Sequence, residues 1–418
     1  MIPSHFQTEF EKIMKRDYFS SEIHPVREKA FSRFMDMGLP TQKWEDWRFT
    51  NLSELKNKKY YISDIKDAPT KPINLEKYKM EGVDTVVFYN GHYQKDISSV
   101  PEGVRLLNGI EYFERNNKSM VCAEYSPFDF LNTALMDSGF CILVEPNTIV
   151  KKPIRFLFVS NGEKAVMTNP RIDIELGQSS SLTFVEHHVG EASSYFQNES
   201  VFVNLAPNVS LDHIRIQTNS SGTINIENLK VSQEKDSQYN FFQFTNGSRF
   251  GRTNLHCELK GEGAECFLNG LTLSDSKSQI DNHIITEHIS QNCTSSQNFK
   301  AILKDRSSGV FSGRVVVRKD AQKTDAKQSS KNLLLSEKAV MNSNPQLEIN
   351  ADDVKCAHSS TSGELDQEAI FYLRSRGLDI QLSKQLLVRG FAMEKINLIK
   401  NKPIYDHILS LFESWVRS

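Results

Sequence analysis

The chain has 418 residues, of which 39% are hydrophobic and 24% are charged, and its formal net charge at pH 7 is −2. Such a composition is typical of a globular protein, and the length favours two or three domains. The 50 basic residues nearly balance the 52 acidic ones, so no strongly positive field indicates a nucleic acid as partner. No run of 18 apolar residues predicts a membrane span, and the polar start of the chain does not resemble a secretory signal.

Six cysteines are scattered along the chain without a C-x-x-C motif. They are Cys122, Cys141, Cys257, Cys266, Cys293 and Cys356. Disulfide frameworks are typical of small secreted chains, so we expect reduced thiols here, most of them buried as apolar residues. This pattern, together with the missing signal, predicts a cytoplasmic protein.

The first forty residues predict two amphipathic helices. One carries an apolar stripe from Phe6 to Met14, and the other has a stripe around Phe31 and ends at Gly38. Residues 66–76 contain prolines among charged residues and predict a linker.

From about residue 84 the pattern changes to short runs of alternating apolar and polar residues, separated by Gly, Ser, Asn and Pro. The clearest runs are 85–89, 154–159, 172–176, 182–187, 200–205 and 211–217. This period of two with frequent turns predicts a mainly β region.

An internal repeat runs through the β region. At steps of 26 to 30 residues, an aliphatic residue that ends a strand is followed five positions later by a small or polar residue. The aliphatic positions are Leu176, Leu205, Val231, Leu259, Ile289 and Val317. A near-constant step without intervening helices favours a β-solenoid, in which stacked coils bury an aliphatic ladder. A β-sandwich also has many short strands, but its spacing drifts, and a propeller blade is longer.

The C-terminal part of the chain predicts helices again. Asp366 caps a helix that ends at Gly377, and Asp379 caps a second helix that ends at Gly390. A third helix has an apolar stripe over 404–415. The predicted layout is an N-terminal helical segment with its linker (1–75), a β-solenoid core (76–360) and a C-terminal helical segment (361–418).

Several well-known catalytic motifs are absent from the sequence. It contains no G-x-x-x-x-G-K-[ST], no H-E-x-x-H and no G-x-S-x-G. A P-loop ATPase is therefore not expected, because the loop and lysine that bind the phosphates are missing.

Most histidines have spacings that favour structural roles. The pairs are His187 with His188, His256 with Cys257, and His283 with His288. Adjacent residues, and residues five apart, point to opposite faces of a continuous strand and make poor co-ligands.

Cys356 and His358 are different, because residues two apart on an extended strand share one face, about 7 Å apart. A thiolate and an imidazole suit iron, zinc or copper, but two ligands do not complete a site. Further ligands would come from a partner chain or from a substrate cluster. Glu348, Asp352 and Asp353 lie just upstream, where they would either assist iron delivery or only solvate a loop.

Three segments carry a specific resemblance. They read DAQKTDAKQSSKNLLLS (320–336), PQLEINADDVKCAH (345–358) and ELDQEAIFYLRSRG (364–377). Together they resemble the C-terminal core of the SufB/SufD family of iron–sulfur cluster assembly proteins, and PTQKWEDWRFTNL (40–52) is similar to its N-terminal motif.

The chain is more similar to the SufD branch than to the SufB branch. Its length and the Lys355-Cys356-x-His358 form are SufD-like. One departure is that Ser359 and Ser360 stand where SufD proteins usually have Gly-Ala, so the packing of this turn is expected to differ.

The resemblance implies a right-handed parallel β-helix flanked by helices, and a non-catalytic scaffold that pairs with SufB and docks the ATPase SufC. The missing P-loop then belongs to SufC. Carried over from the family, the SufC-contacting residues are Phe371, Tyr372, Arg374, Arg376 and Gly377. Phe371 also fits an ordinary core position.

The resemblance also implies that His358, with Cys356 beside it, contributes to nascent-cluster assembly or iron binding at the SufB–SufD interface. We expect no cofactor to be held stably by the isolated chain, a transient Fe–S cluster in the complex, and compatibility of the complex with a flavin. Without SufB, a homodimer through the solenoid edge is expected.

Two alternatives from other classes stay open on the sequence. One is a carbohydrate-active β-solenoid enzyme, which would need acidic or basic groups clustered along one face. The other is a homodimeric structural protein with no metal role.

Overall fold

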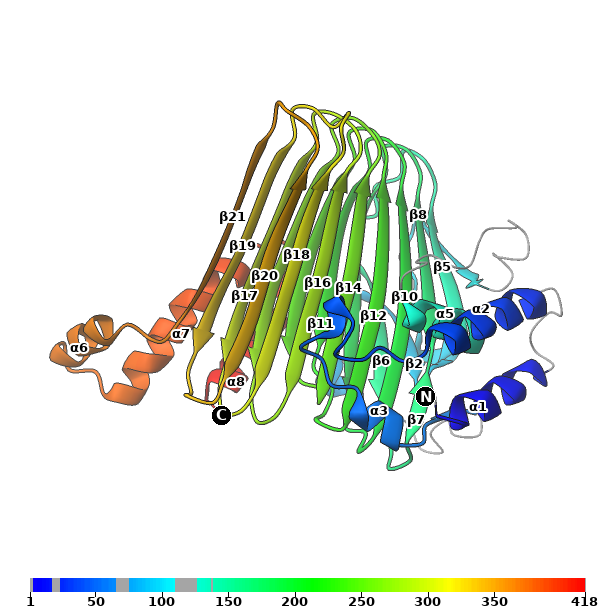
Figure 1. Cartoon of the computed structure of the whole chain (residues 1–418), viewed down its shortest axis with the longest axis horizontal. Coiled ribbons are helices and arrows are strands. Elements are labelled where there is room, and N and C mark those ends of the chain that lie inside the picture. The colour runs from blue at the N-terminus through cyan, green and yellow to red at the C-terminus, as the bar shows by residue number, and fades with distance from the viewer. Residues whose placement is uncertain (1–2, 17–22, 65–74, 110–125, 137, 418) are drawn as a thin grey trace.

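The computed structural model describes residues 3–16, 23–64, 75–109, 126–136 and 138–417. Cys122 and residues 66–74 of the predicted linker lie outside this part of the chain. The described residues form two facing β-sheets whose strands run parallel from coil to coil, with helices at both ends of the chain (Figure 1). This is a mainly β architecture built on a β-solenoid, as predicted.

From β8 to β21, successive strands alternate between the two sheets, so each of these coils contributes one strand to each sheet. Sheet A runs in the order β20 (Val340–Ile349), β18 (Ser308–Val317), β16 (Gln279–His288), β14 (Phe250–Leu259), β12 (Thr223–Gln233), β10 (Tyr195–Leu205), β8 (Pro170–Leu176), β5 (Ser138–Val144) and β4 (Val104–Asn108), with β7 (Val166–Thr168) beside β10 and β1 (Tyr61–Ile62) beside β7. Sheet B runs in the order β21 (Lys355–Gly363), β19 (Asp325–Leu334), β17 (Thr294–Leu303), β15 (Glu265–Ser274), β13 (Gln238–Asn246), β11 (Ser210–Gln217), β9 (Ser181–Gly190), β6 (Ile154–Ser160), β2 (Asp84–Tyr89) and β3 (His92–Tyr93).

The space between the sheets holds the main apolar core. Residues of one strand alternate between this interior and an outer face, as the pleat of a strand requires. Leu176 of β8 and Leu205 of β10 are register partners, and both are buried in this core. The aliphatic ladder that the repeat predicted is therefore present.

The register corrects two positions of the predicted repeat. Gln233, not Val231, is the register partner of Leu205 and Leu259, and His288, not Ile289, is the partner of Leu259 and Val317. These two coils carry a buried polar residue where the others have an aliphatic one. Each has an internal hydrogen-bond partner: the Gln233 amide donates to the carbonyl oxygen of Glu265, and His288 lies 2.7 Å from the hydroxyl of Ser295.

The polar turn residues of the repeat have a conformational reason. At successive corners between sheet A and sheet B, one residue has a positive φ in the left-handed region, which small polar residues tolerate best. These residues are Ser179, Asn208, Asp236, Gly263, Asn292 and Lys323.

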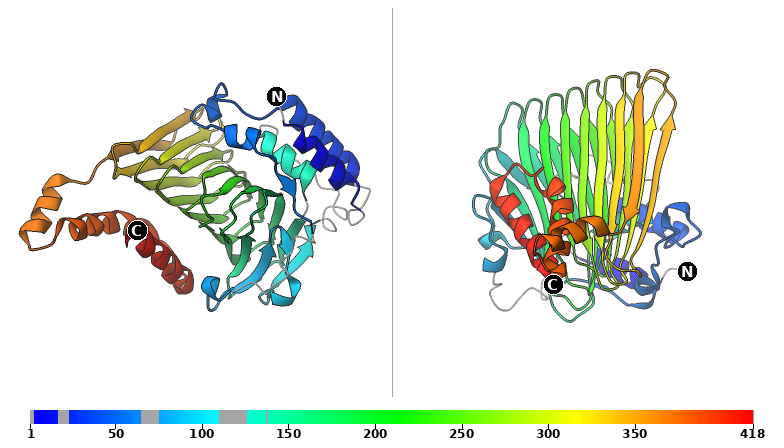
Figure 2. Two further views of the ribbon diagram at one scale, coloured as in Figure 1. Left: turned by 90° about the horizontal axis from the view of Figure 1, so that it is seen from below. Right: turned by 90° about the vertical axis from the view of Figure 1, so that its left-hand side faces the viewer.

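The N-terminal helices cover part of the outer face of sheet A (Figure 2). They are α1 (His5–Met14), α2 (His24–Met37), α3 (Ser53–Asn57) and α5 (Pro127–Leu135), and 3-10 turns lie at Glu45–Trp47, Glu76–Tyr78 and Lys95–Ile97. The apolar stripes of α1 and α2 pack together with α5 on residues such as Ile226. Trp47 is buried against Phe128, and the Arg252 guanidinium lies 3.6 Å from the centre of the Trp47 ring.

The C-terminal segment forms α6 (Gln367–Ser375), α7 (Ile380–Ile396) and α8 (Lys402–Arg417). Asp366 and Asp379 cap α6 and α7 as predicted, because their carboxylates accept from backbone N–H groups of the first turn. The predicted end of the second helix at Gly390 is wrong, since α7 continues to Ile396.

The continuation of α7 has a packing reason. Ala392 and Ile396 beyond Gly390 are buried against sheet B, and α8 packs Ile404, Ile408 and further apolar residues on the same face. This burial outweighs the cost of about 1 kcal/mol for a glycine within a helix. No helix in the described part of the chain is long and apolar enough to cross a membrane.

Candidate functional site

Cys356 and His358 lie on the same face of β21, the last strand of sheet B, in register with Ala326 and Gln328 of β19. Cys356 is half-buried against a small apolar cluster that includes Val317, whereas His358 is exposed. Burial raises the pKa of the Cys356 thiol, so a metal would have to displace its proton.

The acidic residues upstream do not join this pair. Asp353 forms an ion pair with Lys323, and Glu348 lies exposed on β20. Within the described residues, the two groups of three or more His, Cys, Asp and Glu side chains close enough to hold a metal include neither Cys356 nor His358. The pair is thus an incomplete set of metal ligands that is accessible from outside the protein.

The solenoid ends in two open strand edges. Strands β20 and β21 terminate sheets A and B, and their residues are exposed or half-exposed along nearly their whole length (Figure 1). The N–H group of Lys355 donates to the carbonyl oxygen of Thr324 in the preceding coil. Because bonding alternates along a parallel strand, the N–H groups of even-numbered residues, including His358 and Ser360, point to the open edge. Such an edge is a template for another strand.

Helix α6 projects beyond the end of the solenoid (Figures 1 and 2). Phe371 is 73% exposed and Tyr372 is 57% exposed, so the structure does not place Phe371 in the core. Arg374 and Arg376 are also exposed, and the Arg376 guanidinium lies 5.2 Å from the ring centre of Tyr372. Gly377, at φ +91°, ends the helix as predicted.

The exposed apolar surface continues from α6 into the first turns of α7. Ile380, Leu382 and Leu386 are large apolar residues that are exposed there. A cluster of exposed aromatic and aliphatic side chains next to two arginines is typical of a protein-docking surface. We call the residues Phe371, Tyr372, Ile380, Leu382 and Leu386 the α6–α7 surface.

The histidine pairs lie as their spacing predicted. His187 points outward from β9, with its ring centre 5.0 Å from that of His407 in α8, and His188 points inward and stacks on Phe158 at 4.9 Å. One of the two groups of potential metal ligands comprises His256, Glu258 and Glu287, and it lies on the outer face of sheet A. There both carboxylates form ion pairs with lysines or an arginine.

A group of charged residues inside the solenoid was not anticipated from the sequence. It comprises Glu186 and His188 (β9), Glu199 (β10), Arg215 (β11) and Glu227 (β12), all buried, and we call it the interior cluster. Burial, with nearby carboxylates, raises the pKa of Glu199 well above its usual range, and burial raises the pKa of Glu227 to about 8. The sequence held one signal for this cluster. Glu186 lies two residues before His188, so both side chains share one face of a strand, as Cys356 and His358 do.

Comparisons with known proteins agree with this architecture. Residues 158–391 match the SUF system FeS cluster assembly SufBD core domain, and residues 4–156 match the SufBD protein N-terminal region.

Full-length relatives support the same assignment. The iron–sulfur cluster assembly protein SufD of Escherichia coli (strain K12) is 28% identical over 390 residues, which cover 92% of this chain and 91% of that protein. An iron–sulfur cluster assembly SufBD family protein of Synechocystis is 28% identical over 419 residues, covering 95% of this chain and 92% of the relative. A chloroplastic protein of Arabidopsis thaliana is 26% identical over 414 residues, which cover 93% of this chain and 85% of that protein. With a core-domain match over more than half of its length and a β-solenoid fold, the chain belongs to the SufB/SufD family of the SUF iron–sulfur cluster assembly system and is most like SufD.

Proposed function

We propose that this chain is a non-catalytic scaffold subunit of a cytoplasmic SUF assembly complex, which pairs with SufB and docks the ATPase SufC. The observation that carries the proposal is the exposed α6–α7 surface, held away from the solenoid by a capped helix. It contains Phe371 and Tyr372, and Arg374, Arg376 and Gly377 lie beside it; the family resemblance assigns these five residues to SufC contact.

The open edge of the solenoid supports pairing with a second β-solenoid. Strand β21 offers outward N–H groups at His358 and Ser360, and an added strand would satisfy them. SufB is the proposed partner in the complex, and a second copy of this chain would use the same edge when SufB is absent.

Cys356 and His358 would then lie at the junction of the two subunits. We propose that they supply part of a ligand set for a nascent cluster or incoming iron, and that SufB completes the set. Because the two side chains offer only an incomplete site, the cluster is expected to be transient cargo. The same complex remains the place where a flavin would bind.

The proposed work of the chain is mechanical. ATP binding would bring SufC subunits together and pull on α6 and α7, which are joined to sheet B through the buried face of α7 and α8. A shift of these helices would be passed to the solenoid and its open edge. The family assignment favours this role over a carbohydrate-active enzyme, and a structural homodimer without metal role remains the outcome to test against.

Co-purification tests the proposal. Removing residues 364–418 would also uncover the apolar face of sheet B, so point variants are preferable. The chain is co-expressed with SufC and SufB from the same source, as wild type, as Phe371→Asp, and as Gln367→Ala on the same helix. We expect Phe371→Asp to lose SufC but keep SufB in size-exclusion chromatography, with Gln367→Ala unchanged. A folded wild-type chain that binds neither partner would refute the scaffold role.

A further inference from the structure

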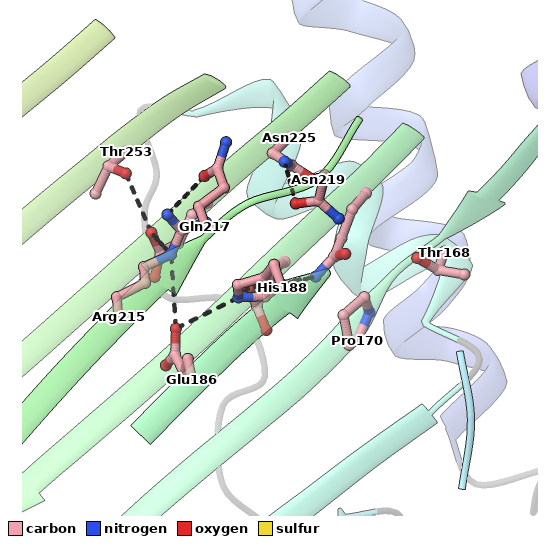
Figure 3. Close-up of polar contacts among 12 residues, drawn as sticks. Thr168, Pro170, Glu186, His188, Arg215, Gln217, Asn219, Asn225 and Thr253 are labelled. Carbon is pink, nitrogen blue, oxygen red and sulfur yellow. Dashed lines mark hydrogen bonds and ion pairs between the residues drawn. The ribbon is translucent and has the colours of Figure 1, made fainter. Parts of the chain in front are cut away.

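The interior cluster brings three potential metal ligands together in the space between the sheets. His188 Nε2 lies 3.3 Å from Glu199 Oε2 and 3.9 Å from Glu186 Oε2. Atoms bound to one ion at about 2.1 Å in a tetrahedral arrangement lie about 3.4 Å apart. Figure 3 shows Glu186 directed toward both His188 and Arg215.

The three side chains are buried and only partly hydrogen-bonded. Glu186 Oε2 and His188 Nε2 are inaccessible to solvent and have no hydrogen-bond partner among the described residues. Glu199 Oε2 has one long contact, 3.5 Å from the amide nitrogen of Gln197, and Glu199 Oε1 has no partner there. Buried polar atoms without partners cost roughly 1–3 kcal/mol each, so a convergent set of them calls for an occupant.

The opposite ends of the same side chains are held in place. His213 Nε2 lies 2.9 Å from Glu186 Oε1, and the hydroxyl of Tyr239 lies 2.8 Å from His213 Nδ1. The amide nitrogen of Gln197 lies 2.9 Å from His188 Nδ1, so this side chain fixes the position of the ring. Turning the amide over places its oxygen there instead, where it accepts the Nδ1 proton and leaves the Nε2 lone pair for an ion. Such outer hydrogen bonds are the means by which proteins orient metal ligands.

The charges of the interior cluster leave room for a divalent cation. Arg215 Nε lies 2.6 Å from Glu227 Oε2 and 3.7 Å from Glu186 Oε2, and it is the cationic side chain of the cluster. If all three carboxylates were ionised, the single guanidinium would leave two negative charges in a site without solvent, which is strongly unfavourable. One divalent cation would neutralise this excess.

We propose that Glu186, His188 and Glu199 bind a divalent transition-metal ion, of the class of Zn²⁺ or Fe²⁺, in the interior of the solenoid. One imidazole and two carboxylates suit such ions, and the site joins β9 to β10. The site is separate from the exposed Cys356–His358 pair, and it does not depend on the scaffold function. Because its ligands are buried, the ion is bound as the chain folds and acts structurally.

The test is metal content after refolding of the full-length chain. The protein is unfolded with a chelator, freed of it, and refolded without metal, with Zn²⁺ or with Co²⁺. We expect about one tightly held ion per chain, a Co²⁺ absorption typical of nitrogen and oxygen ligands, and a higher unfolding midpoint with metal than without. A wild-type chain that refolds to the same stability and holds no metal would show that protons neutralise the cluster, and would overturn the proposal.

Variants locate the ion. Glu199→Gln keeps the shape of the side chain and is expected to lose the bound ion, whereas Glu258→Gln, in the outer group of ligands, is expected to retain it. The double variant Cys356→Ser, His358→Ala is also expected to retain it. An ion that survives Glu199→Gln but disappears in either control would refute the interior site, and if Glu199→Gln does not fold, the wild-type comparison with and without metal still decides the question.

Discussion

The ammonium group of Lys300 in β17 lies 2.6 Å from the carboxylate of Glu394 in α7 and donates to the carbonyl oxygen of Phe391 at 2.9 Å. Lys300 is buried under the helix, and its Nζ lies 4.3 Å from the ring centre of Phe391. This side chain therefore links the solenoid to α7, whose first turns form part of the α6–α7 surface.

Replacing Lys300 by methionine should loosen α7 while leaving the solenoid folded. The variant leaves the Phe391 carbonyl without this donor, and we expect a loss of about 1–3 kcal/mol in the free energy of unfolding. Hydrogen exchange should increase in 380–417 more than in the strands. Glu394→Gln is the matched control and should cost less than about 1 kcal/mol, because Glu394 is largely exposed. Uniform destabilisation of all coils would contradict this link.

Cys356 and His358 should matter for cluster assembly but not for folding. Because the pair is exposed or half-buried, Cys356→Ser with His358→Ala should change the unfolding midpoint little. Loss of two ligands from a shared site should lower cluster formation by the reconstituted complex at least about tenfold. Ser359→Ala, on the opposite face of β21, is the control. Unchanged cluster formation in the double variant would favour the scaffold without a metal role.

Ser360→Pro should weaken pairing through the open edge. Its N–H group points away from β19, so the substitution removes a donor needed by an incoming strand while keeping the bonds to the preceding coil. We expect at least about tenfold weaker association with SufB, and weaker self-association without it, measured by analytical ultracentrifugation. Ser360→Ala keeps the N–H group and should associate normally. Equal association of both variants would place the interface elsewhere.

Asp129 in α5 should make stability depend on pH. Burial raises its pKa to about 7, and Ser200 is the hydrogen-bond partner of its Oδ1. The folded state therefore holds the proton more tightly than the unfolded chain, whose pKa is about 3.9. Stability from this group is complete below about pH 4 and is lost as the pH rises through about 7.

Asp129→Asn mimics the protonated form. It should be about 4 kcal/mol more stable than the wild type at pH 8 and within about 1 kcal/mol of it at pH 4, as measured by urea unfolding. Ser138→Ala, in the neighbouring strand β5 and without an ionisable group, should show no such change with pH. A difference between Asp129→Asn and the wild type that is the same at both pH values would mean that Asp129 is already charged in the folded state.

Local patterns in the sequence were sufficient for the elements and for the class of fold. Alternation gave the positions of strands such as β9 and β11, and Asp366 and Asp379 mark helix starts by chemistry that acts within one turn. The repeat predicted stacked coils because each coil must bury its aliphatic side on the next. The end of α7 was missed, because burial of Ile396 on sheet B is not visible from the glycine six residues earlier.

The amino-acid sequence by itself determined a helix-flanked β-solenoid with Cys356 and His358 on one strand face, since periodicity and spacing act locally. Only the tertiary structure decided the register, which sets Gln233 and His288 among aliphatic neighbours. It also decided which residues form the interior cluster. Glu186 and Glu199 lie on strands of different sheets, and their side chains come together only when the chain completes the coil. Contacts across the interior depend on how the chain winds, and no local pattern encodes them.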